Sequence, residues 1–96
     1  MIPENRIPTH PGRILLEEFL KPMNVSSDEL ARHLGVPTPY IDELIEEERS
    51  ITPEMAWLLS GALATTPEFW MTLQSVYDLA RKRPERHVQQ LQPQVA

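Results

Sequence analysis

The 96-residue sequence predicts an all-α fold of five helices without β-strands. Three features predict it: apolar residues recur at helical spacing, Thr-Pro-Glu motifs mark helix starts, and one stretch has the spacing of a helix-turn-helix. An apolar content of 41% suits a single compact domain. We expect that domain over residues 1–83, with the helix-turn-helix at about 26–46, and a poorly ordered, Gln-rich C-terminal tail over residues 84–96.

The first helix is predicted to begin near Pro11 and to end at about Lys21. Proline suits the first helical position because the N–H that it lacks would have no partner there. Pro22 is then expected to help stop the helix. The helix has a broad apolar face made of Ile14, Leu15, Leu16, Phe19, Leu20 and Met23.

The second helix is predicted to start with a capping box at Ser26. A serine hydroxyl there accepts the third helical N–H, while Glu29 reaches back to the amide of the cap. Leu30 and Leu34 lie four residues apart on one face. Gly35 is the residue best able to take the left-handed conformation that ends a helix, so the chain should turn there.

The third helix is predicted to start after Gly35 with Thr38 as its N-cap and Pro39 in its first position. It continues at helical spacing with Ile41, Leu44 and Ile45. Two helices joined by so short a turn cross at a steep angle, as in a helix-turn-helix. This spacing predicts the structure of the segment but does not by itself establish DNA binding, because a scaffold does not show what it contacts.

Two further helices are predicted to start at Thr52-Pro53-Glu54 and Thr66-Pro67-Glu68, each with a threonine cap and an acid in the first turn. The earlier helix has an apolar stripe of Met55, Leu58, Leu59, Ala62 and Leu63. The later helix has Phe69, Leu73, Val76 and Ala80 on one side, with Trp70 and Tyr77 beside them. This arc is wide, so either a second subunit of a homodimer shares Trp70, Leu73 and Tyr77, or all of them fill the chain's own core. The predicted core comprises Leu15, Phe19, Leu30, Leu34, Ile41, Leu44, Leu58 and Leu59.

The helix-turn-helix stretch carries the whole negative balance of the chain. Between Ser26 and Arg49 there are seven acids and two arginines, which alone gives the net charge of −5. Five of these acids lie between Asp42 and Glu48, where they would repel DNA phosphates. Three interpretations stay open. This surface contacts a basic protein, or DNA contact is confined to the first turn of the third helix, or the acids simply form a solvent-exposed polar end of that helix.

Composition excludes several classes of site and location. The absence of cysteine excludes disulfides, thiolate metal sites and a cysteine nucleophile. His10, His33 and His87 lie too far apart for a metal-binding helix, so we expect neither a metal nor another cofactor. No apolar run approaches the length of a membrane span, and the N-terminus, with Glu4 and Pro8, lacks the layout of a signal peptide, so we expect a cytoplasmic protein.

No arrangement in the sequence predicts an enzyme. Glu17 and Glu18, or the run Glu46–Glu48, are carboxylates of the type that glycosidases use. They lie, however, on helical surfaces that are expected to be exposed, without a segment that would form a pocket. We therefore predict no catalytic residues.

Several segments carry a resemblance to a known family. They are His10-Pro11-Gly12, Leu15 to Leu20, Leu30 to Val36, Arg49 to Thr52, and Thr66 to Trp70 with Leu73-Gln74 and Tyr77-Asp78-Leu79. Together they resemble the HigA-type antitoxins, a branch of the xenobiotic-response-element helix-turn-helix family that is related in fold to phage repressors. The resemblance implies a homodimer that binds operator DNA upstream of its own genes and represses them. It also implies a second partner, a HigB-type toxin, which is a small basic endoribonuclease that cleaves messenger RNA on the ribosome.

The sequence departs from this family where DNA would be read. Similar proteins usually have Arg, Ser or Asn early in the third helix and an Asn-Gly-Lys/Arg-Arg turn at its end. In this chain the early positions hold Thr38, Pro39, Tyr40 and Asp42, and the turn is Glu46-Glu47-Glu48-Arg49. Glu47 replaces the glycine best suited to a left-handed turn. The candidate DNA-binding residues are Ser26, Ser27, Thr38, Tyr40, Asp42 and Arg49. The alternative is a protein-interaction module that has lost specific DNA binding and uses its acidic face for a basic partner.

Overall fold

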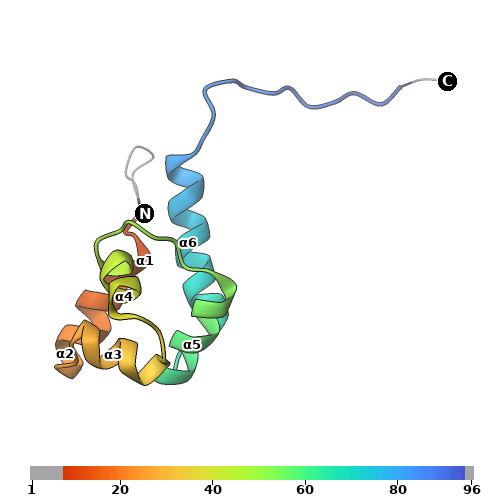
Figure 1. Cartoon of the computed structure of the whole chain (residues 1–96). Coiled ribbons are helices and arrows are strands. Elements are labelled where there is room, and N and C mark those ends of the chain that lie inside the picture. The colour runs from red at the N-terminus through yellow and green to blue at the C-terminus, as the bar shows by residue number, and fades with distance from the viewer. Residues whose placement is uncertain (1–7, 95–96) are drawn as a thin grey trace.

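The computed structural model describes residues 8–94 and has the predicted all-α fold of five helices, with no strand in that range (Figure 1). Residues 1–7, which include Glu4 of the signal-peptide argument, and residues 95–96 lie outside the described part. The first helix is continuous and consists of α1 (Pro11–Ile14), η1 (Leu15–Leu20) and α2 (Lys21–Met23). It is followed by α3 (Ser27–Leu34), α4 (Thr38–Ile45), α5 (Pro53–Leu63) and α6 (Pro67–Arg81).

The first helix does not stop before Pro22, as the sequence had suggested, but runs on to Met23. Its middle section η1 is a π-helix, in which the Lys21 N–H donates to the carbonyl of Leu16, five residues back. A proline ring in a regular α-helix clashes with the carbonyl four residues before it, and the wider turn relieves that clash. The helix ends at Asn24, which takes the left-handed conformation with φ of 56°.

The start of α1 lies directly against the end of α4. His10 caps α1, because its Nδ1 accepts the Gly12 N–H at 2.9 Å. A β-carbon on Gly12 would lie 1.6 Å from the carbonyl oxygen of Leu44, so only glycine allows the two backbones to approach this closely. This contact positions the helix that follows the turn of the helix-turn-helix.

The core contains most of the residues predicted to form it and six further apolar residues that were not in the predicted core. Leu15, Leu30, Ile41, Leu44 and Leu59 are buried as predicted. Phe19, Leu34 and Leu58 are only partly buried and pack against the edge of the core. The remaining apolar members of the core are Leu20, Ala31, Ile51, Met55, Ala56 and Trp70.

The last helix buries a different face from the one that its apolar stripe suggested. Trp70 is fully buried and its Nε1 donates to Thr65 Oγ1 at 2.8 Å, so it belongs to the chain's own core and is not shared with a second subunit. Phe69 and Val76, on a neighbouring side of the helix, are 38% and 44% exposed, and the Phe69 ring lies edge-on to that of Trp70 at 5.0 Å between centroids. Leu73 is half-buried. Residues 82–94 form no helix or strand and extend away from the helical body (Figure 1).

Candidate nucleic-acid interface

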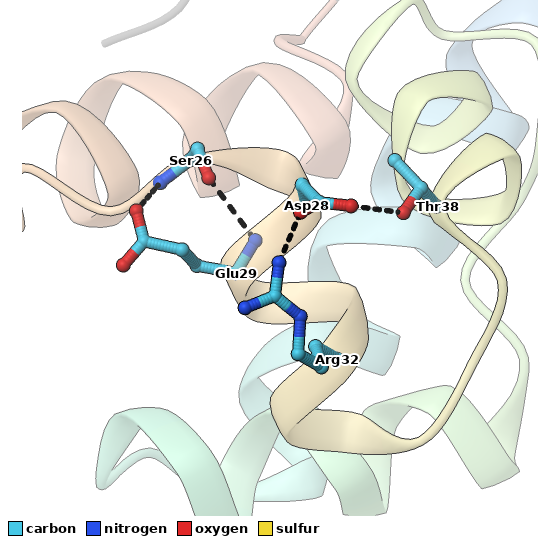
Figure 2. Close-up of polar contacts among 5 residues, drawn as sticks. All are labelled: Ser26, Asp28, Glu29, Arg32 and Thr38. Atoms are coloured by element: carbon cyan, nitrogen blue, oxygen red, sulfur yellow. Dashed lines mark hydrogen bonds and ion pairs between the residues drawn. The ribbon is translucent and has the colours of Figure 1, made fainter.

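The helix-turn-helix forms by the local interactions that its sequence predicts. The capping box at Ser26 is present: its Oγ accepts the Glu29 N–H at 3.0 Å, and its own N–H donates to Glu29 Oε1 at 3.1 Å (Figure 2). Gly35 takes the left-handed conformation with φ of 74°. The Val36 N–H then donates to the carbonyl of Ala31 at 3.0 Å and closes the turn. Ser27 is the first residue of α3 and is half-buried.

Thr38 is not the N-cap of α4, contrary to the sequence-based expectation. Pro37 occupies the cap position with an extended backbone, and Thr38 and Pro39 are the first two helical residues. The reason lies in the preceding helix, because Asp28 Oδ1 accepts a hydrogen bond from Thr38 Oγ1 at 2.8 Å. The threonine hydroxyl therefore bonds to another helix rather than to the backbone of its own.

Asp28 joins the first turns of α3 and α4. Its second oxygen, Oδ2, accepts a hydrogen bond from Arg32 Nη2, so one carboxylate holds both Thr38 and Arg32 (Figure 2). The hydrogen bonds from Thr38 and Arg32, together with the charge of Arg32, hold the pKa of Asp28 below its usual value. Ser26 and Thr38, two of the candidate DNA-binding residues, thus lie at one exposed edge of the helix-turn-helix.

A second cluster forms on the exposed side of α4 around Arg49. The guanidinium Nε and Nη2 both donate to Glu43 Oε1, at 2.9 and 2.7 Å. The same guanidinium lies over the ring of Tyr40, with its central carbon 4.0 Å from the ring centroid. The hydrogen bond to Glu43 raises the pKa of Arg49. Tyr40 and Arg49, both candidate DNA-binding residues, therefore lie together, and Arg49 is held by Glu43, one of the five acids that the sequence assigned to a possible partner-binding face.

The acidic turn after α4 keeps the left-handed geometry without the glycine. Glu47 has φ of 65°. The Glu48 N–H donates to the carbonyl of Glu43 at 2.8 Å, as in a glycine-terminated helix. The nearby carboxyl group of Glu48 raises the pKa of Glu46. Asp42, which was predicted to contact DNA, lies half-buried on α4 and adds to the same negative field.

Behind the acidic turn, an open polar hollow of about 190 Å³ separates it from the end of α6. His10 lies at its base, buried, with its ring edge-on to that of Tyr77 at 4.8 Å between centroids. Burial lowers the pKa of His10, and the nearby carboxylates of Glu47 and Asp78 partly oppose this. Arg81 lines the same hollow and donates to the Tyr77 hydroxyl at 3.0 Å. Tyr77, predicted to lie at a dimer interface, thus makes contacts within its own chain.

The loop between α4 and α5 is attached to α6 through Gln74, which the sequence analysis had noted only as part of a motif. Gln74 is buried, and its Oε1 accepts the Ile51 N–H at 2.7 Å. Its Nε2 donates to Asp78 Oδ1 at 3.0 Å. A glutamine in an otherwise apolar helical pattern was the one available signal, because a buried polar side chain requires partners.

Comparison with known proteins places the chain in a family. A helix-turn-helix family model matches residues 16–70. An uncharacterized helix-turn-helix transcriptional regulator, YbaQ of Escherichia coli, is 43% identical over 77% of the chain, which spans 66% of that protein. Antitoxin HigA-1 of Vibrio cholerae is 39% identical over 77% of the chain and 70% of its own length.

Solved structures agree with this assignment. The antitoxin HigA of Pseudomonas aeruginosa, solved with the higBA promoter, is 43% identical and matches with a TM-score of 0.76 over 77% of this chain and 80% of that one. The antitoxin GraA in complex with its operator is 39% identical, with a TM-score of 0.83 over 97% of this chain and 100% of that one. In the described part of the chain, no helix is long and apolar enough to cross a membrane. The chain belongs to the helix-turn-helix family, in the branch of the HigA-type antitoxins.

Proposed function

We propose that this chain is a HigA-like antitoxin that binds operator DNA, represses its own genes and neutralises a HigB-type toxin in the cytoplasm, with no catalytic activity of its own. One observation carries the proposal: Asp28 and Thr38 hold the first turns of α3 and α4 together at an exposed edge. In a helix-turn-helix this edge faces the duplex, with the second helix in the major groove.

The candidate residues suit the two kinds of contact that such a protein makes. Ser27 is the first residue of α3, where backbone amides of the kind that bind phosphate lie. The Ser26 N–H is used by Glu29 in the capping box, but the Ser26 hydroxyl can still donate to a phosphate. Thr38, Tyr40 and Asp42 provide hydroxyl and carboxylate groups for base edges in the major groove. The similarity to antitoxins that were solved with a promoter or an operator supports this use of the surface.

The acidic turn limits the strength of this binding. Glu46, Glu47 and Glu48 are exposed at the end of α4, opposite the end where Thr38 lies. Their charges repel phosphates, so non-specific affinity is low. Discrimination between sequences then depends on the few contacts at the start of α4.

Duplex titrations over a range of salt test the proposal. Duplex from upstream of this gene should bind more tightly than a scrambled duplex of equal length. Arg49→Ala should weaken both and reduce the slope of log affinity against log salt by about one. Equal affinity of the parent for the two duplexes would reject operator binding.

We also propose that α6 forms a homodimer interface. Phe69, Val76 and Leu79 are exposed at 38%, 44% and 75%, and the half-buried Leu73 and Tyr77 adjoin them. Apolar side chains at this density on one helix favour a second copy, because symmetric dimers are the commonest assemblies. A dimer would also present two helix-turn-helix units to a two-fold symmetric operator.

The second candidate function is a protein-interaction module that does not bind DNA specifically. The raised pKa of Glu46, caused by Glu48 and other acids nearby, shows how concentrated the negative charge is on this turn. Such a surface favours a basic partner such as the toxin. Replacing Glu46 and Glu48 by Lys should abolish toxin binding and raise non-specific DNA affinity. A parent that binds the toxin but shows no operator preference would favour this second function over autorepression.

A further inference from the structure

We infer that Glu43 is a positioning residue for operator binding: it holds the Arg49 guanidinium against Tyr40 so that the remaining N–H groups of Arg49 contact a DNA phosphate. This inference rests on the proposed function. It implies that an acid on the exposed side of α4 strengthens DNA binding, although its charge alone would weaken it.

The geometry fixes the arginine from two directions. Two of its nitrogens, Nε and Nη2, donate to the same oxygen of Glu43, and its central carbon Cζ lies over the Tyr40 ring, 4.0 Å from the centroid. The side chains of Arg49 and Glu43 are each about two-fifths exposed, at 40% and 41%, so solvent or a ligand reaches the pair. Within residues 8–94, the hydrogen bonds and ion pairs of the guanidinium to acids involve Nε and Nη2, and none involves Nη1. A guanidinium carries five N–H donors in a rigid fork, so the pair leaves donors on Nη1 for a second anion.

Holding the arginine before DNA arrives has a thermodynamic consequence. An unrestrained arginine loses rotamer freedom when it binds a phosphate, whereas one already fixed by Glu43 and Tyr40 loses less. The negative charge of Glu43 acts against this gain, because a carboxylate repels phosphate. The positive charge of the adjacent Arg49 guanidinium offsets that repulsion. Glu43 also differs from Glu46–Glu48, which have no cationic partner among the ion pairs of the described residues.

The test asks whether removing the Glu43 carboxylate weakens or strengthens DNA binding. Glu43→Ala should weaken binding of the upstream duplex by about five- to tenfold and lower the salt slope toward that of Arg49→Ala. Glu43→Gln keeps an oxygen that accepts from Arg49, so it should stay within about twofold of the parent. The matched control Glu48→Gln removes one carboxylate from the same stretch without touching Arg49, and it should tighten binding of both duplexes because repulsion is reduced.

Two further variants distinguish the placement of the Arg49 guanidinium from the charges of Arg49 and Glu43. Arg49→Lys keeps the charge but cannot donate through a planar fork or stack in the same way, so it should retain the salt slope and lose affinity for the upstream duplex. In an Arg49→Ala background, Glu43→Ala should no longer weaken binding and should slightly strengthen it, because only repulsion remains to be removed. Circular dichroism melts of each variant establish that the compared proteins are folded.

Each outcome supports or overturns the inference. If the parent prefers the upstream duplex but Glu43→Ala binds it more tightly, Glu43 acts only by repulsion and the inference is wrong while the proposed function stands. If Glu43→Ala weakens binding equally with and without Arg49, Glu43 does not act through the arginine. If the parent has no preference for the upstream duplex, the proposed function and the phosphate contact are both rejected.

Discussion

At the scale of single residues, Glu47 holds a backbone conformation that glycine adopts at less cost. Its φ of 65° lies in the left-handed region, where a β-carbon crowds the following carbonyl. Glu47→Gly should therefore stabilise the protein by about 1 kcal/mol, measured as the free energy of unfolding in urea. The neighbouring Glu48→Gly serves as a control, because Glu48 does not have a positive φ and the change should bring no such gain. Equal effects of the two variants would contradict this account.

His10 links stability to pH at the same scale. Its Nδ1 accepts the Gly12 N–H only while the imidazole is neutral, and burial lowers its pKa. Because the folded pKa lies below the unfolded value of about 6.5, the unfolded chain takes up this proton first, and stability is lost as the pH falls below about 6.5. Above that value the contribution is fully present.

A variant isolates this contribution. Asparagine is a good N-cap that does not titrate, so His10→Asn should lose less stability than the parent between about pH 7 and pH 5. Urea unfolding midpoints at several pH values provide the measurement. Parallel profiles for the parent and the variant would show that His10 does not titrate on unfolding in this range.

At the scale of elements, Gln74 connects the loop after the helix-turn-helix to α6. Gln74→Leu would leave the buried Ile51 N–H without its acceptor and Asp78 without a donor, which should cost about 1–3 kcal/mol of unfolding free energy. Ser75→Ala, an exposed neighbour on the same helix, should change stability little. Denaturant titrations distinguish the two, and a Gln74→Leu variant as stable as Ser75→Ala would contradict the role of this link.

The observed helix starts also show which of them can be predicted from local sequence. The helix starts at Ser26, Thr52 and Thr66 form where their caps predict, because a cap and its N–H partner lie three residues apart. The start of α4 differs by one residue, since Thr38 bonds to Asp28, ten positions earlier. A local pattern cannot reveal which of two partners a hydroxyl will take.

At the scale of the whole molecule, the burial of Trp70 and the exposure of Val76 separate core from interface. Val76→Asp should leave the helix content intact and halve the mass found by sedimentation, because it places a charge in the proposed dimer surface. Trp70→Ala should instead cost about 3–5 kcal/mol of stability, as a fully buried aromatic does. A parent that sediments as a monomer at micromolar concentrations would refute the dimer.

By itself, the sequence determined the all-α class, the helix-turn-helix between Ser26 and Ile45 and the membership of the HigA-type branch. The fold class and the helix-turn-helix follow from caps, turn residues and apolar spacing, which act between residues a few positions apart. The family branch follows instead from the resemblance of whole motifs such as Thr66 to Trp70 with Leu73-Gln74. The buried positions Leu15, Leu30, Ile41, Leu44 and Leu59 followed from the same spacing.

Only the tertiary structure decided which face of α6 is covered, and it placed Trp70 inside and Val76 outside. It alone paired Glu43 with Arg49 across the acidic turn and Gln74 with Ile51 across 23 positions. The physical reason is that burial and long-range pairing depend on how helices pack in space. A wide apolar arc or a run of carboxylates is compatible with several arrangements of buried and exposed residues. Which arrangement forms depends on the contacts that all five helices make together.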